Sequence, residues 1–310
     1  MANMMERPDL LPEGLERVAC NLCGEDQATT LFQSGDFCVV RCVQCGLAYV
    51  NPRLGGHRRQ AVYDDAYMEA LPEEGDWDWR RTPEYNPMSW KVTRLRYAIN
   101  GHPTGTLLDV GCATGNFLSL VKQRGWEIWG VEFNPHAAAT AARRLNAEVL
   151  PGDLVDLHLP REYFDVVTLF HVIEHALDPR RTVRKIREVL KRKARLVLET
   201  PDFGSKSERK MGAKWPHVKP REHLYYFNEQ SLRKLLREEG FQINKLRRCG
   251  GLGVLQSGET ARSGSRLKNR AFELRRSLAP FPWLRNLARR LYWDILRQNE
   301  HILVVASRCS

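Results

Sequence analysis

The segment from Leu107 to Gly115, LLDVGCATG, places a carboxylate and a glycine turn directly after a short apolar run. Glycine lacks a Cβ, so Gly111 and Gly115 allow a strand to turn tightly into a helix and let bare backbone approach a ligand. Dinucleotide-binding turns follow the pattern G-x-G-x-x-G, whereas here Asp109 precedes the first glycine. A carboxylate at that position repels a pyrophosphate and attracts a cationic amino group. The turn therefore predicts a ligand that carries an amino group.

Three further polar side chains follow apolar runs downstream of this turn. Glu132 comes roughly twenty residues after the glycines, where a carboxylate can hydrogen-bond both hydroxyls of a ribose. Asp153 follows the next apolar run, and His171 follows the run FDVVTLF at 164–170. Taken one at a time, each is equally well explained as a polar cap or a loop residue.

The elements that must position these side chains alternate between two hydrophobic periodicities. Apolar runs at 106–110, 127–131, 164–170 and 195–199 alternate with helical stretches at 135–145 and 178–191. This order is typical of βαβ units and predicts an α/β fold with a parallel sheet. Such a sheet binds its ligand at the carboxyl ends of its strands, which is where the four polar side chains are expected.

With these motifs in this order, the chain resembles the class I S-adenosylmethionine-dependent methyltransferases. The resemblance covers roughly Met88 to Leu246 and a final strand at Ile302–Ala306, and it implies a Rossmann-like seven-stranded sheet. It also implies that S-adenosylmethionine lies over the glycine turn, with its ribose on Glu132 and its adenine amino group near Asp153. The cofactor-binding residues that the resemblance implies are Asp109, Gly111, Cys112, Ala113, Gly115, Glu132, Phe133, Asp153, Leu154, Phe170 and His171.

The residues from His171 to His175 match a second pattern, because H-x-x-E-H on a helix is the inverted zinc-peptidase motif. That motif needs both histidines on one helical face and a further carboxylate ligand downstream. Here it begins at the end of a strand that the methyltransferase pattern includes. In that family the matching segment forms the floor beneath the methyl group, so we favour the methyltransferase interpretation.

The segment KPREHLYYF at 219–227 is the candidate for the acceptor side. Methyl transfer is an in-line displacement, so the enzyme positions the nucleophile and, for a hydroxyl or carbon acid, removes a proton. In the sugar methyltransferases that this chain resembles, an EH pair at this place lies near the acceptor, which implies catalytic roles for Glu222 and His223. His223 is either the base or an anchor for its loop, and His175 and His217 are weaker candidates. The motif N/D-P-P-Y, which serves transfer to the exocyclic nitrogens of bases, does not follow 164–170.

Two cysteine pairs, Cys20-x-x-Cys23 and Cys42-x-x-Cys45, have metal-ligand spacing, and a glycine follows each pair. Four thiolates suit a structural, tetrahedral Zn²⁺ ion. Disulfides are the alternative, but the first residues lack the apolar core of a secretory leader, so we expect a reducing, cytoplasmic location. Zinc modules of this kind precede some class I methyltransferases that act on nucleotide-linked sugars. The resemblance therefore implies a saccharide, nucleotide-sugar or lipid-linked glycan acceptor.

Positive charge is concentrated late in the sequence. The chain has a formal net charge of +11, and residues 262–300 hold ten Lys or Arg against three acidic residues. Apolar residues recur there at helical spacing, which predicts basic amphipathic helices. Helices of this kind over 262–297 suit peripheral contact with an anionic membrane at its inner surface, and a helical cap with solvated arginines is the alternative. No apolar run approaches the length of a membrane span.

The expected organisation has five parts. They are a zinc-ribbon-like module at 1–60, a linker helix and aromatic loop at 61–100, the methyltransferase domain at 101–250, a basic helical insertion at 251–300 and the last strand at 301–310. An RNA methyltransferase fits the charge and the cysteines but lacks a recognisable RNA-binding module, so a nucleic-acid partner is disfavoured. A non-catalytic protein that kept the cofactor fold is the third alternative. The methylated atom, a hydroxyl oxygen or a carbon, and the oligomeric state are not encoded in any motif that we recognise.

Overall fold

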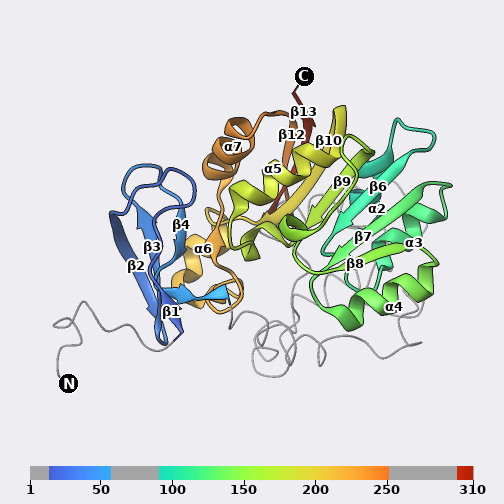
Figure 1. Cartoon of the computed structure of the whole chain (residues 1–310). Coiled ribbons are helices and arrows are strands. Elements are labelled where there is room, and N and C mark those ends of the chain that lie inside the picture. Colours follow the sequence, from blue (N-terminus) through green and yellow to red (C-terminus); the bar gives the residue numbers. More distant parts are fainter. Residues whose placement is uncertain (1–13, 57–90, 251–298, 310) are drawn as a thin grey trace, which may run out of the picture.

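The computed structural model describes residues 14–56, 91–250 and 299–309 (Figure 1). Its centre is a seven-stranded sheet in the order β12-β13-β10-β9-β6-β7-β8. These strands are β6 (Thr106–Val110), β7 (Glu127–Glu132), β8 (Glu148–Pro151), β9 (Phe164–Phe170), β10 (Leu190–Pro201), β12 (Phe241–Gly250) and β13 (Asn299–Arg308). The strands from β8 to β10 pair in parallel, and β13 pairs antiparallel with both of its neighbours. The α/β fold with its seven-stranded, Rossmann-like sheet is confirmed.

Helices cover both faces of this sheet. The α-helices are α2 (Lys91–Ile99), α3 (Asn116–Lys122), α4 (Pro135–Leu145), α5 (Pro179–Val189), α6 (Lys206–Met211) and α7 (Glu229–Glu238), and the short 3₁₀ helices are η1 (Leu154–Asp156), η2 (Ile173–His175) and η3 (Gly212–Lys214). Buried side chains of α2, α3 and α4 share one apolar core, and those of α5 and α7 share the other. The sheet is therefore sandwiched, and its carboxyl edge remains available for the site.

Local sequence signals explain where α4 begins and ends. The side chain of Asn134 accepts hydrogen bonds from the amides of His136 and Ala137 at 2.9 and 3.0 Å, and Pro135 occupies the first turn. These are the features that start a helix. Asn146 ends the helix in the left-handed conformation. The helix expected at 178–191 ends earlier, at Val189, because Leu190 already begins β10.

The cysteine module forms a second sheet beside the first. Strands β2 (Ala28–Ser34), β3 (Phe37–Cys42) and β4 (Ala48–Val50) pair antiparallel, and β1 (Leu15–Glu16) pairs with β5 (Arg53–Leu54). The fourth strand of the module sheet is β11 (Tyr225–Tyr226), which comes from the acceptor segment and pairs with β4. The module is therefore joined by backbone hydrogen bonds to the segment that follows His223.

Two differences from the expected organisation concern the domain borders. Helix α2, expected as part of a linker, packs against the main sheet through buried Leu95 and Ala98. Strand β13 begins at Asn299, inside the range expected for the helical insertion. Residues 61–90 of the expected linker helix and aromatic loop, and the basic segment at 262–297, lie outside the described residues. Within the described ranges, no helix has the length and apolar character needed to cross a membrane.

Candidate active site

The glycine turn has the geometry that its sequence predicts. Gly111 has φ +73°, and its amide donates to the carbonyl oxygen of Val131 at 2.7 Å. A Cβ at Gly111 would lie 2.3 Å from Cγ2 of Val172, and a Cβ at Gly115 would lie 2.5 Å from Cδ1 of Leu145. Both glycines are therefore needed for the left-handed backbone and for close packing.

Glu132 joins the turn to the end of β7. Its Oε2 accepts from the amide of Ala113, and its Oε1 accepts from the amide of Asn134, both at 2.9 Å. Burial raises the pKa of Glu132, and the backbone hydrogen bonds oppose that rise. Cys112 is buried, and its Sγ lies close to the backbone of Gly130. A Cβ added at Gly130 would be only 2.8 Å from this Sγ. The Cys112 thiol thus packs against the sheet.

Asp109 is buried next to a hydroxyl that the sequence analysis did not identify. Its Oδ1 accepts from Oγ1 of Thr168 at 2.6 Å, across the parallel pair β6 and β9. Burial raises the pKa of Asp109 to about 7, although Thr168 lowers it. A cationic amino group beside Asp109 would favour the ionised form. The sequence feature that could have identified Thr168 is its hydroxyl side chain within the apolar run of β9.

The remaining residues expected at the cofactor also follow the carboxyl ends of the strands. Asp153 caps η1 by accepting from the amide of Val155 at 3.3 Å, and Leu154 is buried beside it. Phe170 ends β9 and lies edge-on to Phe117, with ring centres 5.1 Å apart. Phe133 and His171 directly follow β7 and β9. The structure therefore places the residues expected to bind the cofactor along one edge of the sheet.

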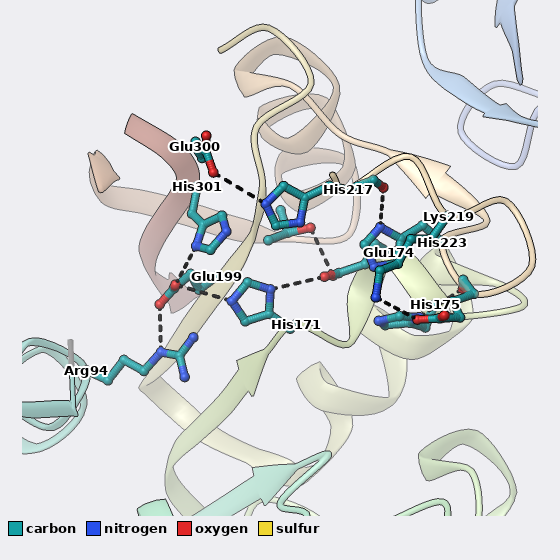
Figure 2. Close-up of polar contacts among 12 residues, drawn as sticks. Arg94, His171, Glu174, His175, Glu199, His217, Lys219, His223, Glu300 and His301 are labelled. Carbon is teal, nitrogen blue, oxygen red and sulfur yellow. Dashed lines mark hydrogen bonds and ion pairs between the residues drawn. The ribbon is translucent and has the colours of Figure 1, made fainter. Parts of the chain in front are cut away.

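His171 lies between two buried carboxylates (Figure 2). Its Nδ1 is 3.3 Å from Oε1 of Glu174, and its Nε2 is 3.4 Å from Oε1 of Glu199. Burial alone would lower the pKa of His171, but the two carboxylates raise it to about 9. His171 also has φ +58°, a strained conformation for a residue other than glycine, and such strain is common at functional sites.

Five histidines gather beside the carboxyl edge of the sheet (Figure 2). The ring centres of His171 and His301 are 4.6 Å apart, those of His301 and His217 are 5.1 Å apart, and those of His175 and His223 are 4.7 Å apart. His301 and Glu199 were not expected at the site. They come from strands far apart in the sequence. The sequence feature that could have identified them is that each is a polar residue within a largely apolar strand.

The hydrogen bond of His223 defines which of its nitrogens is free. Nδ1 of His223 is 2.8 Å from the carbonyl oxygen of His217, and because a carbonyl only accepts, Nδ1 carries the proton. Burial, together with the nearby His175, holds the pKa of His223 well below its usual value. Neutral His223 therefore presents Nε2 as a lone-pair nitrogen, which is the form required of a base.

Glu222 and His175, the other residues expected to be catalytic, have different contacts near His223. The carboxylate of Glu222 is 3.4 Å from Nζ of Lys219 and is partly exposed. The carbonyl oxygen of Glu222 accepts from Nδ1 of His175 at 2.9 Å. The backbone of Glu222 thus positions His175, while its side chain pairs with Lys219.

The four cysteines of the module converge on one point. One ligand atom from each of Cys20, Cys23, Cys42 and Cys45 lies within 4.8 Å of the others. The Sγ atoms of Cys20 and Cys45 are 3.4 Å apart, as are those of Cys23 and Cys42. These separations exceed a disulfide bond and approach the roughly 3.8 Å edges of a zinc-thiolate tetrahedron with 2.3 Å bonds. The donor set therefore fits Zn²⁺.

Comparison with known proteins places this geometry in a family. The model of the methyltransferase domain family matches residues 57–246, more than half of the chain. A probable S-adenosylmethionine-dependent methyltransferase of Mycolicibacterium smegmatis is 26% identical over 219 residues, covering 70% of this chain and 77% of the relative. Demethylmenaquinone methyltransferase of Thermotoga maritima is 34% identical over 112 residues, covering 35% of this chain and 48% of the relative.

Other similarities are shorter or more distant. A probable S-adenosylmethionine-dependent methyltransferase of Mycobacterium tuberculosis is 33% identical over 97 residues, which span 31% of this chain and about a third, 35%, of the relative. The crystal structure of a methyltransferase of Archaeoglobus fulgidus has a TM-score of 0.47 at 21% identity, covering 70% of this chain and 92% of that one. The family match, together with the glycine turn and Glu132, shows that the chain belongs to the class I S-adenosylmethionine-dependent methyltransferases.

Proposed function

We propose that this protein transfers a methyl group from S-adenosylmethionine to a hydroxyl or carbon of a saccharide, nucleotide-sugar or lipid-linked glycan. The observation that carries the proposal is the polar character of the carboxyl edge, where five histidines and the carboxylates of Glu174, Glu199 and Glu300 gather. Side chains of this kind hydrogen-bond an acceptor rich in hydroxyl groups. An apolar acceptor ring would instead need apolar and aromatic walls.

The residues of the chain would share the work as follows. Gly111, Glu132 and Asp109 would hold the cofactor, and the family resemblance implies that the segment after β9 would lie beneath its methyl group. When bound, S-adenosylmethionine would supply the methyl group to the attacking acceptor atom, with its carbon–sulfur bond broken and S-adenosylhomocysteine released. Nε2 of His223 takes the acceptor proton, because Nδ1 already donates to His217. The main contribution of the protein is to align the two reactants.

A quinone or other phenolic acceptor is the second candidate. It is favoured by the similarity to demethylmenaquinone methyltransferase and to a ubiquinone biosynthesis O-methyltransferase of Pseudomonas paraeruginosa, which is 28% identical over 151 residues. These matches cover 48% and 61% of the relatives. The polar edge is the observation against this candidate.

A turnover assay tests the proposal. Release of S-adenosylhomocysteine would be measured with panels of nucleotide sugars, lipid-linked glycans and demethylated quinones, beside the variants Glu132→Ala and His223→Gln. Turnover with a sugar-bearing acceptor that both variants lose would support the proposal. Turnover confined to quinones would select the second candidate, and cofactor binding without turnover on any panel would favour a non-catalytic role.

Two further properties accompany this proposal. We propose that the four-cysteine cluster holds structural Zn²⁺, which elemental analysis of the purified chain would detect. We also propose that the basic segment at 262–297 touches anionic lipid, since its ten Lys or Arg against two acidic residues would attract such a surface. Sedimentation with vesicles of anionic and neutral lipid tests this contact, and equal binding to both kinds would exclude the charge-based explanation.

A further inference from the structure

A second group of metal-binding side chains lies beside the candidate active site, apart from the four cysteines. His171, Glu199 and His301 come from the ends of β9, β10 and β13, which are neighbours in the sheet (Figure 2). One ligand atom from each lies within 4.8 Å of the others. We propose that these three residues bind a first-row divalent metal ion.

The spacing of the donor atoms carries the first step of the argument. Nδ1 of His301 is 3.2 Å and Nε2 of His171 is 3.4 Å from the same atom, Oε1 of Glu199. An ion about 2.1 Å from each donor holds neighbouring donors about 3.0 to 3.4 Å apart in octahedral and tetrahedral sites. Two of the three donor pairs therefore already have the spacing of a coordinated ion, and the third pair lies within 4.8 Å.

The donor types indicate which ion fits. Two imidazoles and one carboxylate suit Zn²⁺, Fe²⁺, Co²⁺ or Mn²⁺, whereas Mg²⁺ and Ca²⁺ prefer oxygen ligands. Oε2 of Glu199 is 2.7 Å from Nε of Arg94, so this guanidinium would orient the carboxylate from outside the metal site. Such outer contacts are usual for carboxylate ligands.

Charge balance is consistent with an ion at this position. Glu174 and Glu199 are buried carboxylates, and Arg94 supplies one positive charge to Glu199. A divalent ion held by His171, Glu199 and His301 would compensate the remaining negative charge.

The group is open on one side. The side chains of Glu199 and His301 are 6% and 7% exposed, whereas that of His171 is 32% exposed. Three protein ligands with one open position are characteristic of metal sites that bind a water or substrate oxygen. The opening lies next to His171, so we expect water or an acceptor oxygen as a further ligand. Binding of the ion itself does not depend on the proposed acceptor.

A neighbouring group, Glu174 with His175 and His223, is less suited to a metal ion. Both oxygens of Glu174 already have partners outside this group, because Oε1 is 3.3 Å from Nδ1 of His171 and Oε2 accepts from Oγ1 of Thr200 at 2.9 Å.

Metal stoichiometry tests the proposal without any acceptor. The full chain, carrying no oligohistidine tag, would be stripped of metal, loaded with Co²⁺ and analysed for cobalt per chain and for its absorption spectrum. We expect two equivalents, of which one shows thiolate-to-cobalt charge transfer from the cysteine cluster. His301→Ala and Glu199→Gln should each lose one equivalent and keep the thiolate bands. His136→Ala, at an exposed position of α4, is the matched control and should keep both equivalents.

Either of two results would overturn the proposal. One is a wild-type chain that binds a single equivalent, all of it thiolate-coordinated. The other is an unchanged second equivalent in both variants. If the buried variants fail to fold, His171→Asn decides the question, because asparagine tolerates the left-handed backbone and the side chain is partly exposed. Loss of turnover plays no part in this test, so failure of the proposed function would leave its result intact.

Discussion

Nδ1 of His223 donates a hydrogen bond to the carbonyl oxygen of His217, at 2.8 Å, and this contact fixes the tautomer of the candidate base. His223→Gln removes the lone-pair nitrogen, so we expect turnover to fall at least about 100-fold while cofactor affinity is retained. Turnover assays and calorimetric titration with S-adenosylhomocysteine measure the two quantities. Unchanged turnover would show that His223 only anchors its loop.

Glu222→Gln provides a separate test of the neighbouring residue. Its carboxylate pairs with Lys219 at the surface, so we expect a much smaller loss of turnover than for His223→Gln. The same steady-state assay decides this. A loss as large as that of His223→Gln would assign the Glu222 carboxylate a direct catalytic role.

Asp109 should make the stability of the cofactor-free protein depend on pH. Burial raises its pKa from 3.8 to about 7, so the folded chain keeps a proton that the unfolded chain releases between these values. The free energy of unfolding therefore falls as pH rises through this window, by up to about 4 kcal/mol. Asp109→Asn should abolish this contribution, gaining stability relative to wild type at about pH 8 and losing cofactor affinity. Melting curves of both proteins across the window would show no difference in slope if Asp109 titrates normally.

Removing one ligand of the cysteine cluster should affect catalysis through the module sheet. Cys42→Ser should lose the zinc and loosen the pairing of β4 with β11, which begins two residues after His223. We expect a lower kcat and a lower melting temperature, with cofactor affinity nearly retained. Cys38→Ser, in the same strand but outside the quartet, is the control. Equal zinc content in both variants would contradict the assignment.

Gly111→Ala should destabilise the turn for two separable reasons. The left-handed backbone costs about 1–2 kcal/mol, and the added methyl group overlaps Val172, which adds about 1–3 kcal/mol. Gly101→Ala is the control, because φ is +87° and nothing lies within 4 Å of the added Cβ. Denaturant unfolding measures both changes. Combining Gly111→Ala with Val172→Ala should recover part of the loss, and no recovery would exclude the overlap.

Local signals were sufficient for the elements that position the cofactor. The run FDVVTLF forms β9 over Phe164–Phe170, and the helix expected at 135–145 has those bounds because Asn134 and Asn146 terminate it. The glycine turn was predictable because tight turns and close packing leave few alternatives to glycine. These features depend on neighbouring residues in the sequence.

The contacts that depend on tertiary structure were not predictable in the same way. Thr168 meets Asp109 because two parallel strands fall into a particular register, and β11 joins β4 across more than 170 residues of sequence. His301 meets His171 only after β13 has entered the sheet. The sequence contains the residues of these pairs, but their separation along the chain does not reveal that they meet in the folded sheet.

The position of β13 has a consequence for how the protein is made. It comes last along the chain among the strands that the structure describes, yet it lies between β10 and β12, inside the sheet. While a ribosome is still synthesising the preceding residues, β10 and β12 lack their shared neighbour and expose unpaired backbone edges. We expect the nascent chain to depend on chaperones or on fast completion at this stage, since exposed edges favour aggregation. Ribosome-bound chains stalled before residue 299 should therefore be more sensitive to protease than the released protein.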